Sequence, residues 1–315
     1  MPKFRKSGGM SGFTYPAQHL NLNEAIETGL IRLPLGVETG KATGVKEIYI
    51  PAPKNLHPER IREVRIFPRN QCFYVEWIYE KTESIYQLDP LKALAIDPGI
   101  KNWLTCISNT GDSFIIDGKR PNFWNRTLNR EVAKHHSGYW SKKLALMTEK
   151  RNRRMRDYIN KISRHLANYC INSGIGTVVM GWNQGIKQKS NLGKKNNQNF
   201  VQLPTVRLKE RLKVVLTEVG VNFVEVNEAY TSKASFLDGD MIPEYGNKPT
   251  DWKPSGKRIA TKLYRTAKGW IVNADSNAAG NILKVASIPG VDLGEIARGS
   301  VTCPIRLDLY LTVLV

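Results

Sequence analysis

An α/β fold built on one mixed β-sheet is predicted by the order of apolar segments in the second part of the chain. Three apolar segments, at 91–99, 102–109 and 113–118, are separated only by short turns, which indicates three strands joined by hairpins. A long helical pattern follows them. Two further apolar segments, at 177–182 and 222–228, have a helical pattern between them and a final helix after them. This order is typical of the RNase H class, in which helices flank a mixed sheet.

A small β-rich domain is predicted ahead of this fold, so that residues 1–90 form one domain and residues 91–315 the other. The first 90 residues are rich in proline, glycine and short apolar runs. Two alternating runs among them are joined at Arg69 and Asn70, which is typical of a β-hairpin.

One long basic helix is predicted within the α/β domain, over about residues 126–173. Apolar residues recur at helical spacing along its second half, at Ile159, Ile162, Leu166, Tyr169 and Cys170. We expect Gly174 to end this helix, because glycine readily adopts the left-handed backbone that closes helices.

The charge of the chain predicts a polyanionic partner. It carries 47 Lys and Arg against 28 Asp and Glu, a net charge of +19, which exceeds what solubility needs. Between Lys119 and Arg164 fourteen cations face three acids, whereas a solvated helix face usually mixes charges of both signs. Together with the basic segment 186–200, this predicts a nucleic-acid channel. Its expected contacts are Lys142, Lys143, Arg151, Arg153, Arg154, Arg156, Lys187, Lys189, Lys194 and Lys195.

The sequence lacks the patterns typical of membrane-spanning, secreted, and zinc- or disulfide-stabilised proteins. The longest apolar stretches fall short of the ~20 residues that span a bilayer, and no apolar segment follows the basic N-terminus as in a secretory signal, so we expect a cytoplasmic protein without a membrane partner. The four cysteines are scattered without a C-x-x-C pair, which supports neither a zinc site nor a disulfide framework. Tyr139 and Trp140 lie among charges and are candidates for base stacking, although aromatic residues on a helix usually face the core.

The candidate catalytic residues are Asp97, Glu228 and Asp275. Asp97 follows the most apolar strand, Glu228 follows a short strand, and Asp275 begins the final helix. Hard cations such as Mg²⁺ prefer oxygen ligands, and two ions about 3.5–4 Å apart can hold both the attacking water and the leaving oxygen of a phosphodiester. We therefore expect the three carboxylates to meet at one edge of the sheet and to hold two Mg²⁺ ions.

Structural roles are the alternatives for these acids. Asp97 precedes Pro98 and Gly99 and would also suit a turn, and Asp275 would suit a helix N-cap. The nearest rival of Glu228 is Glu225, within the preceding strand, and further rivals are Asp238 and Asp240.

The segments AIDPGIKNW, EAYTSKASFLDGD and NADSNAAGNIL, in this order and spacing, resemble the TnpB (OrfB) proteins of insertion sequences, which are compact relatives of the type V CRISPR effectors. The resemblance covers about residues 90–290 closely and the preceding β-rich region more loosely. It implies a RuvC-type RNase H-like core in an RNA-guided DNA endonuclease. Its cofactor would be Mg²⁺, and its partners would be target DNA and a guide RNA from the end of the element.

Carried over by motif, Asp97 matches the first RuvC carboxylate and Asp275 the third. In the family, the second RuvC carboxylate usually follows the strand that corresponds to residues 177–182. This chain has Gly181 and Trp182 at that place, so Glu228 is the expected replacement. The chain also lacks the paired cysteines of the family's zinc ribbon, so no structural zinc is expected. It begins near the end of the family's N-terminal helical region, which predicts an N-terminally short copy.

The leading functional prediction is an RNA-guided, Mg²⁺-dependent DNA endonuclease of a transposable element. The alternative is a nuclease-inactive or truncated nucleic-acid-binding protein, such as a guide-dependent repressor or a transposition accessory. A transposase that joins DNA strands is a third possibility, and it is weakened because the sequence shows no domain for recognising element ends.

Overall fold

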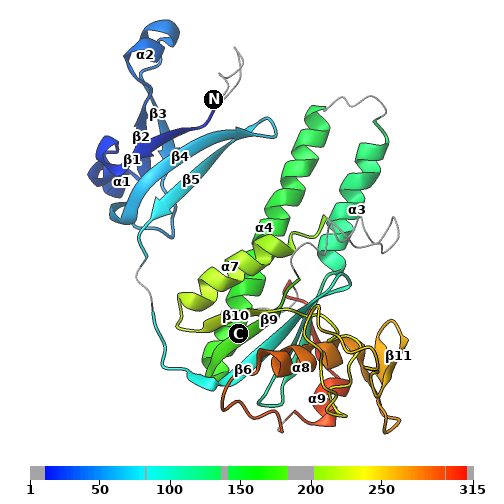
Figure 1. Ribbon diagram of the computed structural model, residues 1–315. Helices are drawn as coiled ribbons and strands as arrows, with labels where there is room; N and C mark the ends of the chain where they lie inside the picture. Colours follow the sequence, from blue (N-terminus) through cyan, green and yellow to red (C-terminus); the bar gives the residue numbers. More distant parts are fainter. Residues whose placement is uncertain (1–10, 82–83, 136–140, 184–201, 295, 311–315) are drawn as a thin grey trace. The chain divides into compact units, whose positions relative to one another are not determined.

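The structure is a computed structural model that describes residues 11–81, 84–135, 141–183, 202–294 and 296–310 (Figure 1). The chain divides into two compact units. The first, called the β unit, comprises residues 1–83 and 138–149, and the second, the α/β unit, comprises residues 84–137 and 150–315.

The β unit contains a three-stranded antiparallel sheet in the order β1–β4–β5 and a two-stranded antiparallel sheet of β2 and β3. The strands are β1 (Phe13–Pro16), β2 (Leu30–Pro34), β3 (Glu47–Pro51), β4 (Ile61–Arg69) and β5 (Cys72–Tyr79). Short helices connect them: η1 (Ala17–His19), α1 (Leu22–Thr28), α2 (Val37–Thr43) and η2 (Pro58–Arg60). Their core is apolar and small, with Ile31, Leu33, Ile61 and Val64 fully buried.

The predicted hairpin is the pair β4 and β5, and its turn lies one residue later than expected, at Asn70 and Gln71. Both residues have positive φ angles, 49° and 59°. Two left-handed residues match the right-handed twist of the paired strands, which explains why asparagine is at the first position. The Asn70 side chain also donates to Glu149 Oε2 at 3.0 Å, and Glu149 is fully buried in this unit.

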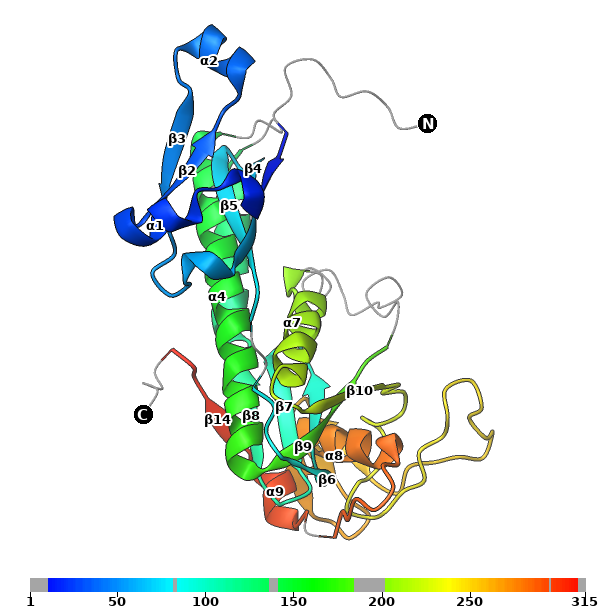
Figure 2. The same ribbon diagram turned by 90° about the vertical axis from the view of Figure 1, so that its left-hand side faces the viewer.

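The α/β unit is built on a six-stranded mixed sheet in the order β10–β9–β6–β7–β8–β14 (Figures 1 and 2). Its strands are β6 (Asp89–Pro98), β7 (Asn102–Ser108), β8 (Ser113–Asp117), β9 (Ile175–Gly181), β10 (Asn222–Val226) and β14 (Ile305–Leu307). The pairs β6–β7 and β7–β8 are antiparallel, whereas β6–β9, β9–β10 and β8–β14 are parallel. The first five strands have the RNase H order, so the predicted fold class is confirmed. Strand β14 adds a sixth strand outside that order.

Both faces of the sheet are covered by helices. Four successive apolar residues of β6 are buried, and their side chains point alternately to the two faces. Leu94 and Ile96 of β6 pack into a core with α4 (Lys142–Ser173) and α7 (Thr205–Thr217). Ala93 and Ala95 point to the other face, which is covered by α8 (Ala274–Ala286) and α9 (Arg298–Thr302). A small three-stranded sheet of β11 (Lys257–Ala260), β12 (Leu263–Arg265) and β13 (Ile271–Asn273) leads into α8.

The single helix predicted over 126–173 is wrong in its extent, because two helices cover this part of the chain. Helix α3 spans Lys119–Ala133, and α4 begins at Lys142, where Ser141 Oγ accepts a hydrogen bond from Leu144 N at 3.3 Å. Ser137 and Gly138, which have low helix propensity, lie between them in the sequence. The apolar face predicted for the second half is confirmed in the core, and Gly174 follows α4 with a φ of 65°.

Among the described residues, no helix combines the length and apolarity that a bilayer crossing requires. All four cysteines are free thiols, and Cys106 and Cys170 are buried in the core. Burial raises the pKa of both of these thiols.

Candidate functional site

Two acidic side chains lie at one edge of the sheet in the α/β unit, and a third comes from the start of α8. Asp97 lies near the end of β6, Glu228 follows β10 by two residues, and Asp275 is the second residue of α8. Strands β6, β9 and β10 are parallel, so their carboxyl ends share this edge. Burial raises the pKa of Asp97 well above its ordinary value, and the negative charges of Glu228 and Asp275 raise it further. The structure therefore brings these carboxylates within electrostatic reach of one another.

The Glu228 side chain lies against the end of β9. A Cβ atom placed on Gly181 would be 3.0 Å from Glu228 Oε2 and 3.2 Å from its Cβ. The backbone brings the two ends together, because Trp182 N donates to Val226 O at 2.8 Å. Glu228 thus fills the space beside the residue where the family resemblance implies a carboxylate.

Glu228 is also an under-satisfied acid. Its Oε1 accepts a hydrogen bond from Asn183 Nδ2 at 3.3 Å, whereas its buried Oε2 has no hydrogen-bond partner among the described residues. Burial raises the pKa of Glu228 to about 7. A buried carboxylate oxygen without a donor is costly unless a cation or a proton binds it.

Asp275 is not the cap of α8, so that structural alternative is wrong. Asn273 caps the helix, and its Oδ1 accepts from Asp275 N and Ser276 N, both at 3.0 Å. The Asp275 carboxylate instead faces two donors. Asn102 Nδ2 lies 2.7 Å from its Oδ2, and Arg258 Nη2 lies 3.0 Å from its Oδ1.

The rival acids have structural partners. Glu225 Oε2 lies 2.6 Å from Lys209 Nζ. Asp240 Oδ2 accepts from the backbone N–H groups of residues 235 and 255, at 2.7 and 3.0 Å. Asp238 accepts from Ser235 and from the backbone of Ala267, and these hydrogen bonds lower its pKa although burial opposes the shift. Glu225 thus links β10 to α7 (Thr205–Thr217), whereas Asp238 and Asp240 hold together the loops around β11.

The donor chemistry of the cluster suits a hard divalent cation, but a side chain occupies part of it. Among the described residues, no group of three or more His, Cys, Asp or Glu side chains is arranged to hold a metal ion. Arg258 pairs with Asp275, and its positive charge also lowers the pKa of Asp97. The guanidinium therefore supplies the positive charge that this cluster of acids attracts. The raised pKa values and the unpartnered Glu228 oxygen fit Mg²⁺ in place of that charge.

A cavity of about 450 Å³ adjoins Asp275. It lies between the turn after β6 and the β11–β12 hairpin. Its lining includes three exposed cationic side chains, and the full set is Gly99, Ile100, Lys101, Asn102, Arg258, Thr261, Lys262 and Asp275. A cavity with cations around one carboxylate suits a phosphodiester, whose charge the lysines would neutralise.

The predicted nucleic-acid contacts fall into three groups. Exposed side chains along α4 are those of Lys142, Lys143, Arg153, Arg154 and Arg156. Arg151 is half-buried, and its guanidinium donates to Asn125 Oδ1 at 2.8 and 2.5 Å and to Gln202 O at 3.0 Å. Lys187, Lys189, Lys194 and Lys195, together with Tyr139 and Trp140, lie outside the described residues.

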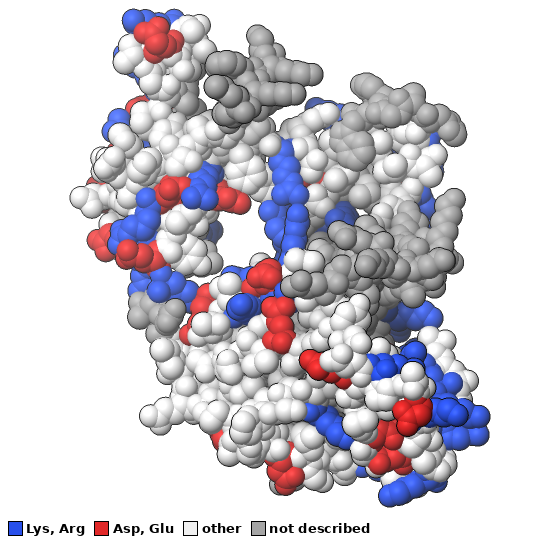
Figure 3. Space-filling view, viewed as in Figure 1, with Lys and Arg blue, Asp and Glu red and all other residues white. Residues whose placement is uncertain are grey.

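A further basic region, at residues 248–268, was not predicted from the sequence. Over residues 248–268 seven cations accompany one acid, Asp251, and all seven are exposed: Lys248, Lys253, Lys257, Arg258, Lys262, Arg265 and Lys268. Figure 3 shows basic side chains gathered over the region of β11, as well as along α4. The charge imbalance within this short segment was the available signal.

Comparison with known proteins relates the chain to one family. Residues 76–187 match the OrfB_IS605 family, described as a probable transposase. This segment, rather than the whole chain, is similar to the OrfB family. Asp97 lies within the matched segment, whereas Glu228 and Asp275 lie beyond it. No curated protein matches the chain.

Two solved structures are similar to this chain over 74% of its length. One is a cryo-EM structure of a Cas12f1–sgRNA–target DNA complex, with 19% identity and a TM-score of 0.49. The other is a cryo-EM structure of a CRISPR-Cas12f ternary complex, with 18% identity and a TM-score of 0.44. The matched region covers 46% of each of those chains, so this chain spans less than half of their length.

The raised pKa of Glu228 predicts a pH-dependent cost to stability. Because its pKa rises from 4.5 to about 7 on folding, the folded state binds the proton more tightly, and this stabilisation is present below pH 4.5 and lost as the pH rises through 7. We expect Glu228→Gln to remove this loss, which is about 3 kcal/mol in the metal-free protein. Urea unfolding in EDTA at pH 5 and pH 8 measures it, with Glu225→Gln as the control. An equal pH dependence in wild type and Glu228→Gln would contradict the assignment.

Proposed function

We propose that the chain is an RNA-guided DNA endonuclease of a transposable element, which hydrolyses phosphodiester bonds with two Mg²⁺ ions held by Asp97, Glu228 and Asp275. The observation that carries the proposal is the cluster of these carboxylates at one edge of an RNase H-type sheet, with raised pKa values at Asp97 and Glu228. Acids that are costly to keep charged and lie at a sheet edge are candidates for catalysis or metal binding.

Each part of the site has a role in this proposal. Bound Mg²⁺ would activate a water molecule and stabilise the leaving oxygen. The carboxylates of Asp97, Glu228 and Asp275 would hold the ions, and Arg258 would exchange its contact with Asp275 for one with the phosphate. Lys101 and Lys262, which line the adjoining cavity, would hold the strand to be cut.

The basic surfaces support nucleic-acid partners. Arg153, Arg154 and Arg156 would grip the backbone of a guide–target duplex, so that base pairing selects the sequence and the protein reads only shape and charge. The same role is proposed for Arg151 and for the lysines at 142, 143, 187, 189, 194 and 195. The β unit would add a further nucleic-acid contact. The guide would be an RNA from the end of the element, and the target would be DNA.

The direct test is to express the chain together with the DNA that follows its reading frame and to sequence the RNA that co-purifies. In the presence of Mg²⁺ we expect the complex to cut DNA that matches this RNA, and we expect EDTA to abolish the cleavage. Asp97→Ala should bind the same RNA without cutting. If no RNA co-purifies, or if Asp97→Ala cuts as wild type does, the proposal fails.

A binding protein without nuclease activity is the second candidate. The ion pair between Arg258 and Asp275, in a part of the chain where the described acids form no ready metal site, favours it. In the same assay such a protein would bind RNA and matched DNA and leave the DNA intact. Joined products on DNA that carries the element ends would instead indicate a strand-transfer enzyme.

A further inference from the structure

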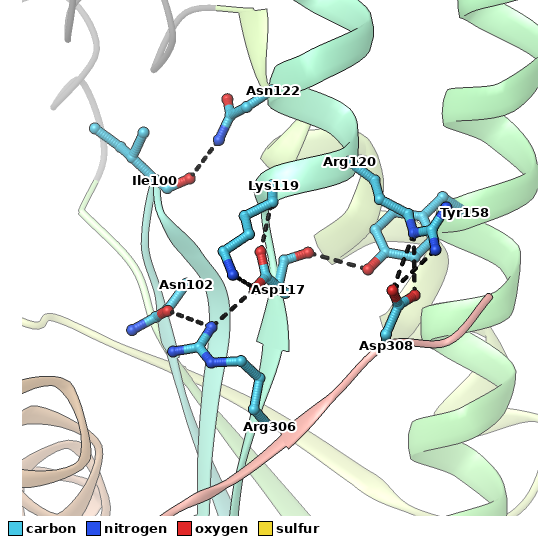
Figure 4. A network of polar contacts seen from close by, with 9 residues as sticks. All are labelled: Ile100, Asn102, Asp117, Lys119, Arg120, Asn122, Tyr158, Arg306 and Asp308. Atoms are coloured by element: carbon cyan, nitrogen blue, oxygen red, sulfur yellow. Dashed lines mark hydrogen bonds and ion pairs between the residues drawn. The ribbon is translucent and has the colours of Figure 1, made fainter. Parts of the chain in front are cut away.

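A chain of polar contacts leads from the outer strand β14 to Asp275. Arg306 of β14 places Nη1 3.0 Å from Asp117 Oδ2 and 3.0 Å from Asn102 Oδ1 (Figure 4). Asn102 in turn donates from Nδ2 to Asp275 Oδ2 at 2.7 Å. The four groups come from β8, β14, β7 and α8, so the contacts cross the sheet from its added strand to the candidate site.

These contacts allow only one orientation of the Asn102 side-chain amide. A guanidinium has hydrogen-bond donors and no acceptor, so Asn102 must turn its oxygen towards Arg306. The amide nitrogen of Asn102 then faces Asp275, where a carboxylate can only accept. Arg306 and Asp275 therefore favour the same orientation of the Asn102 amide, and Arg306 holds the oxygen end of that amide in place.

The surroundings hold Asn102 firmly. Asn102 is only 4% exposed, and the side chain of Asp117, which pairs with Arg306, is 13% exposed. The tight turn after β6 brings its backbone close, because a Cβ on Gly99 would lie 2.4 Å from Asn102 O. Hydrogen bonds to charged groups in such poorly hydrated places are stronger than neutral ones at the surface.

We propose that Asn102, oriented by Arg306, is a positioning residue for Asp275. Its hydrogen bond engages Oδ2 of Asp275, while Oδ1 of the same carboxylate faces Arg258. Strand β14, outside the five-stranded RNase H order, thereby supports the site. This inference rests on the proposed role of Asp275 as a metal ligand.

The test measures metal affinity in the full chain by the EPR signal of Mn²⁺, with Mg²⁺ as competitor. Asn102→Leu and Arg306→Met remove the contacts while retaining much of the side-chain volume. Residues that orient a ligand typically change metal affinity by 10–100-fold, so we expect each variant to bind at least about 10-fold more weakly. Arg306→Lys should keep most of the affinity, because a single nitrogen serves both partners of Arg306 and an ammonium can replace it.

Arg120 provides the matched control. It binds Asp308, which follows β14, at 2.9–3.2 Å without contacting Asn102 (Figure 4). Arg120→Gln therefore loosens the same segment and should leave metal affinity within about 3-fold of wild type, below the 10-fold scale of an orienting contact. Circular dichroism and thermal unfolding would establish that each variant folds.

The outcomes separate this inference from the proposed function. If Asp97→Ala and Asp275→Ala abolish Mn²⁺ binding but Asn102→Leu and Arg306→Met do not weaken it, the positioning role is wrong and the proposed function stands. An equal loss in Arg120→Gln also overturns it, because the segment would then act only as a scaffold. If wild type shows no binding that depends on Asp275, both proposals fail.

Discussion

Replacing Glu228 with alanine is expected to lower Mg²⁺-dependent DNA cleavage by about 10³-fold or more, on the scale seen when one member of a catalytic set is removed. The reason is that Glu228 contributes a buried carboxylate with one unpartnered oxygen at the sheet edge. Single-turnover cleavage of matched DNA by the purified protein–RNA complex measures the loss. Guide and target binding, measured separately, should stay near wild type.

Glu225→Ala is the control for this prediction, since Glu225 is the nearest acid in the sequence and pairs with Lys209. We expect it to cleave at a rate close to wild type. If Glu225→Ala abolishes cleavage while Glu228→Ala does not, the assignment of the second carboxylate moves to Glu225.

Introducing a carboxylate at position 181 gives a sharper check. Glu228 occupies the space above Gly181, where a new Cβ would also approach Ile282 Cδ1 to 2.6 Å. Gly181→Glu alone should therefore destabilise the protein. In the Glu228→Ala background that space is partly vacated, and we expect Gly181→Glu to recover part of the lost cleavage. No recovery in a folded double variant would indicate that the position of the backbone, as well as the charge, is required.

Raising the salt concentration from 50 to 200 mM is expected to weaken nucleic-acid binding by about 10³-fold or more, if six or more phosphates are neutralised. The cause is the release of counterions from the nucleic acid by the basic surfaces along α4 and over residues 248–268. Filter binding or anisotropy across this range gives the slope. A flat response would contradict a backbone-binding role for these surfaces.

Exposed arginines of α4 should carry part of this slope. The double variant Arg153→Glu, Arg154→Glu reverses two charges and should weaken nucleic-acid binding. It should also reduce the slope of log K against log salt concentration, since each phosphate contact contributes about one unit to that slope. Lysines at both positions keep the charge and should bind nearly as wild type. If the double reversal unfolds the protein, these residues have a structural role.

Strands β6 to β10 of the α/β unit were predictable because each carries its own local signal. Apolar runs between turn residues mark β6, β7, β8 and β9, and their order was enough to predict the sheet. The two-helix arrangement of α3 and α4 was missed, because the basic composition continues across Ser137 and Gly138. Strand β14 was missed as well, since it has only three residues and is the outermost strand of the sheet, where it pairs with β8.

The candidate site was predictable in its residue types and less so in its contacts. Asp97 and Asp275 were predicted as site residues from their positions at a strand end and a helix start and from the family resemblance. Arg258 was not foreseen, because an arginine in a short hairpin has no pattern that indicates a carboxylate partner. Its contact with Asp275 depends on how β11 is placed against α8.

The sequence by itself determined the fold class, the surplus of positive charge and the set of acids proposed for the candidate site, because periodicity and composition are local properties of a chain. Only the tertiary structure decided that Glu228 lies over Gly181 and that Asn102 links Arg306 to Asp275. Asn102 is separated from those two partners by 204 and 173 residues. Contacts of that range depend on strand register and side-chain direction at the sheet edge, which are set by the packing of the whole α/β unit.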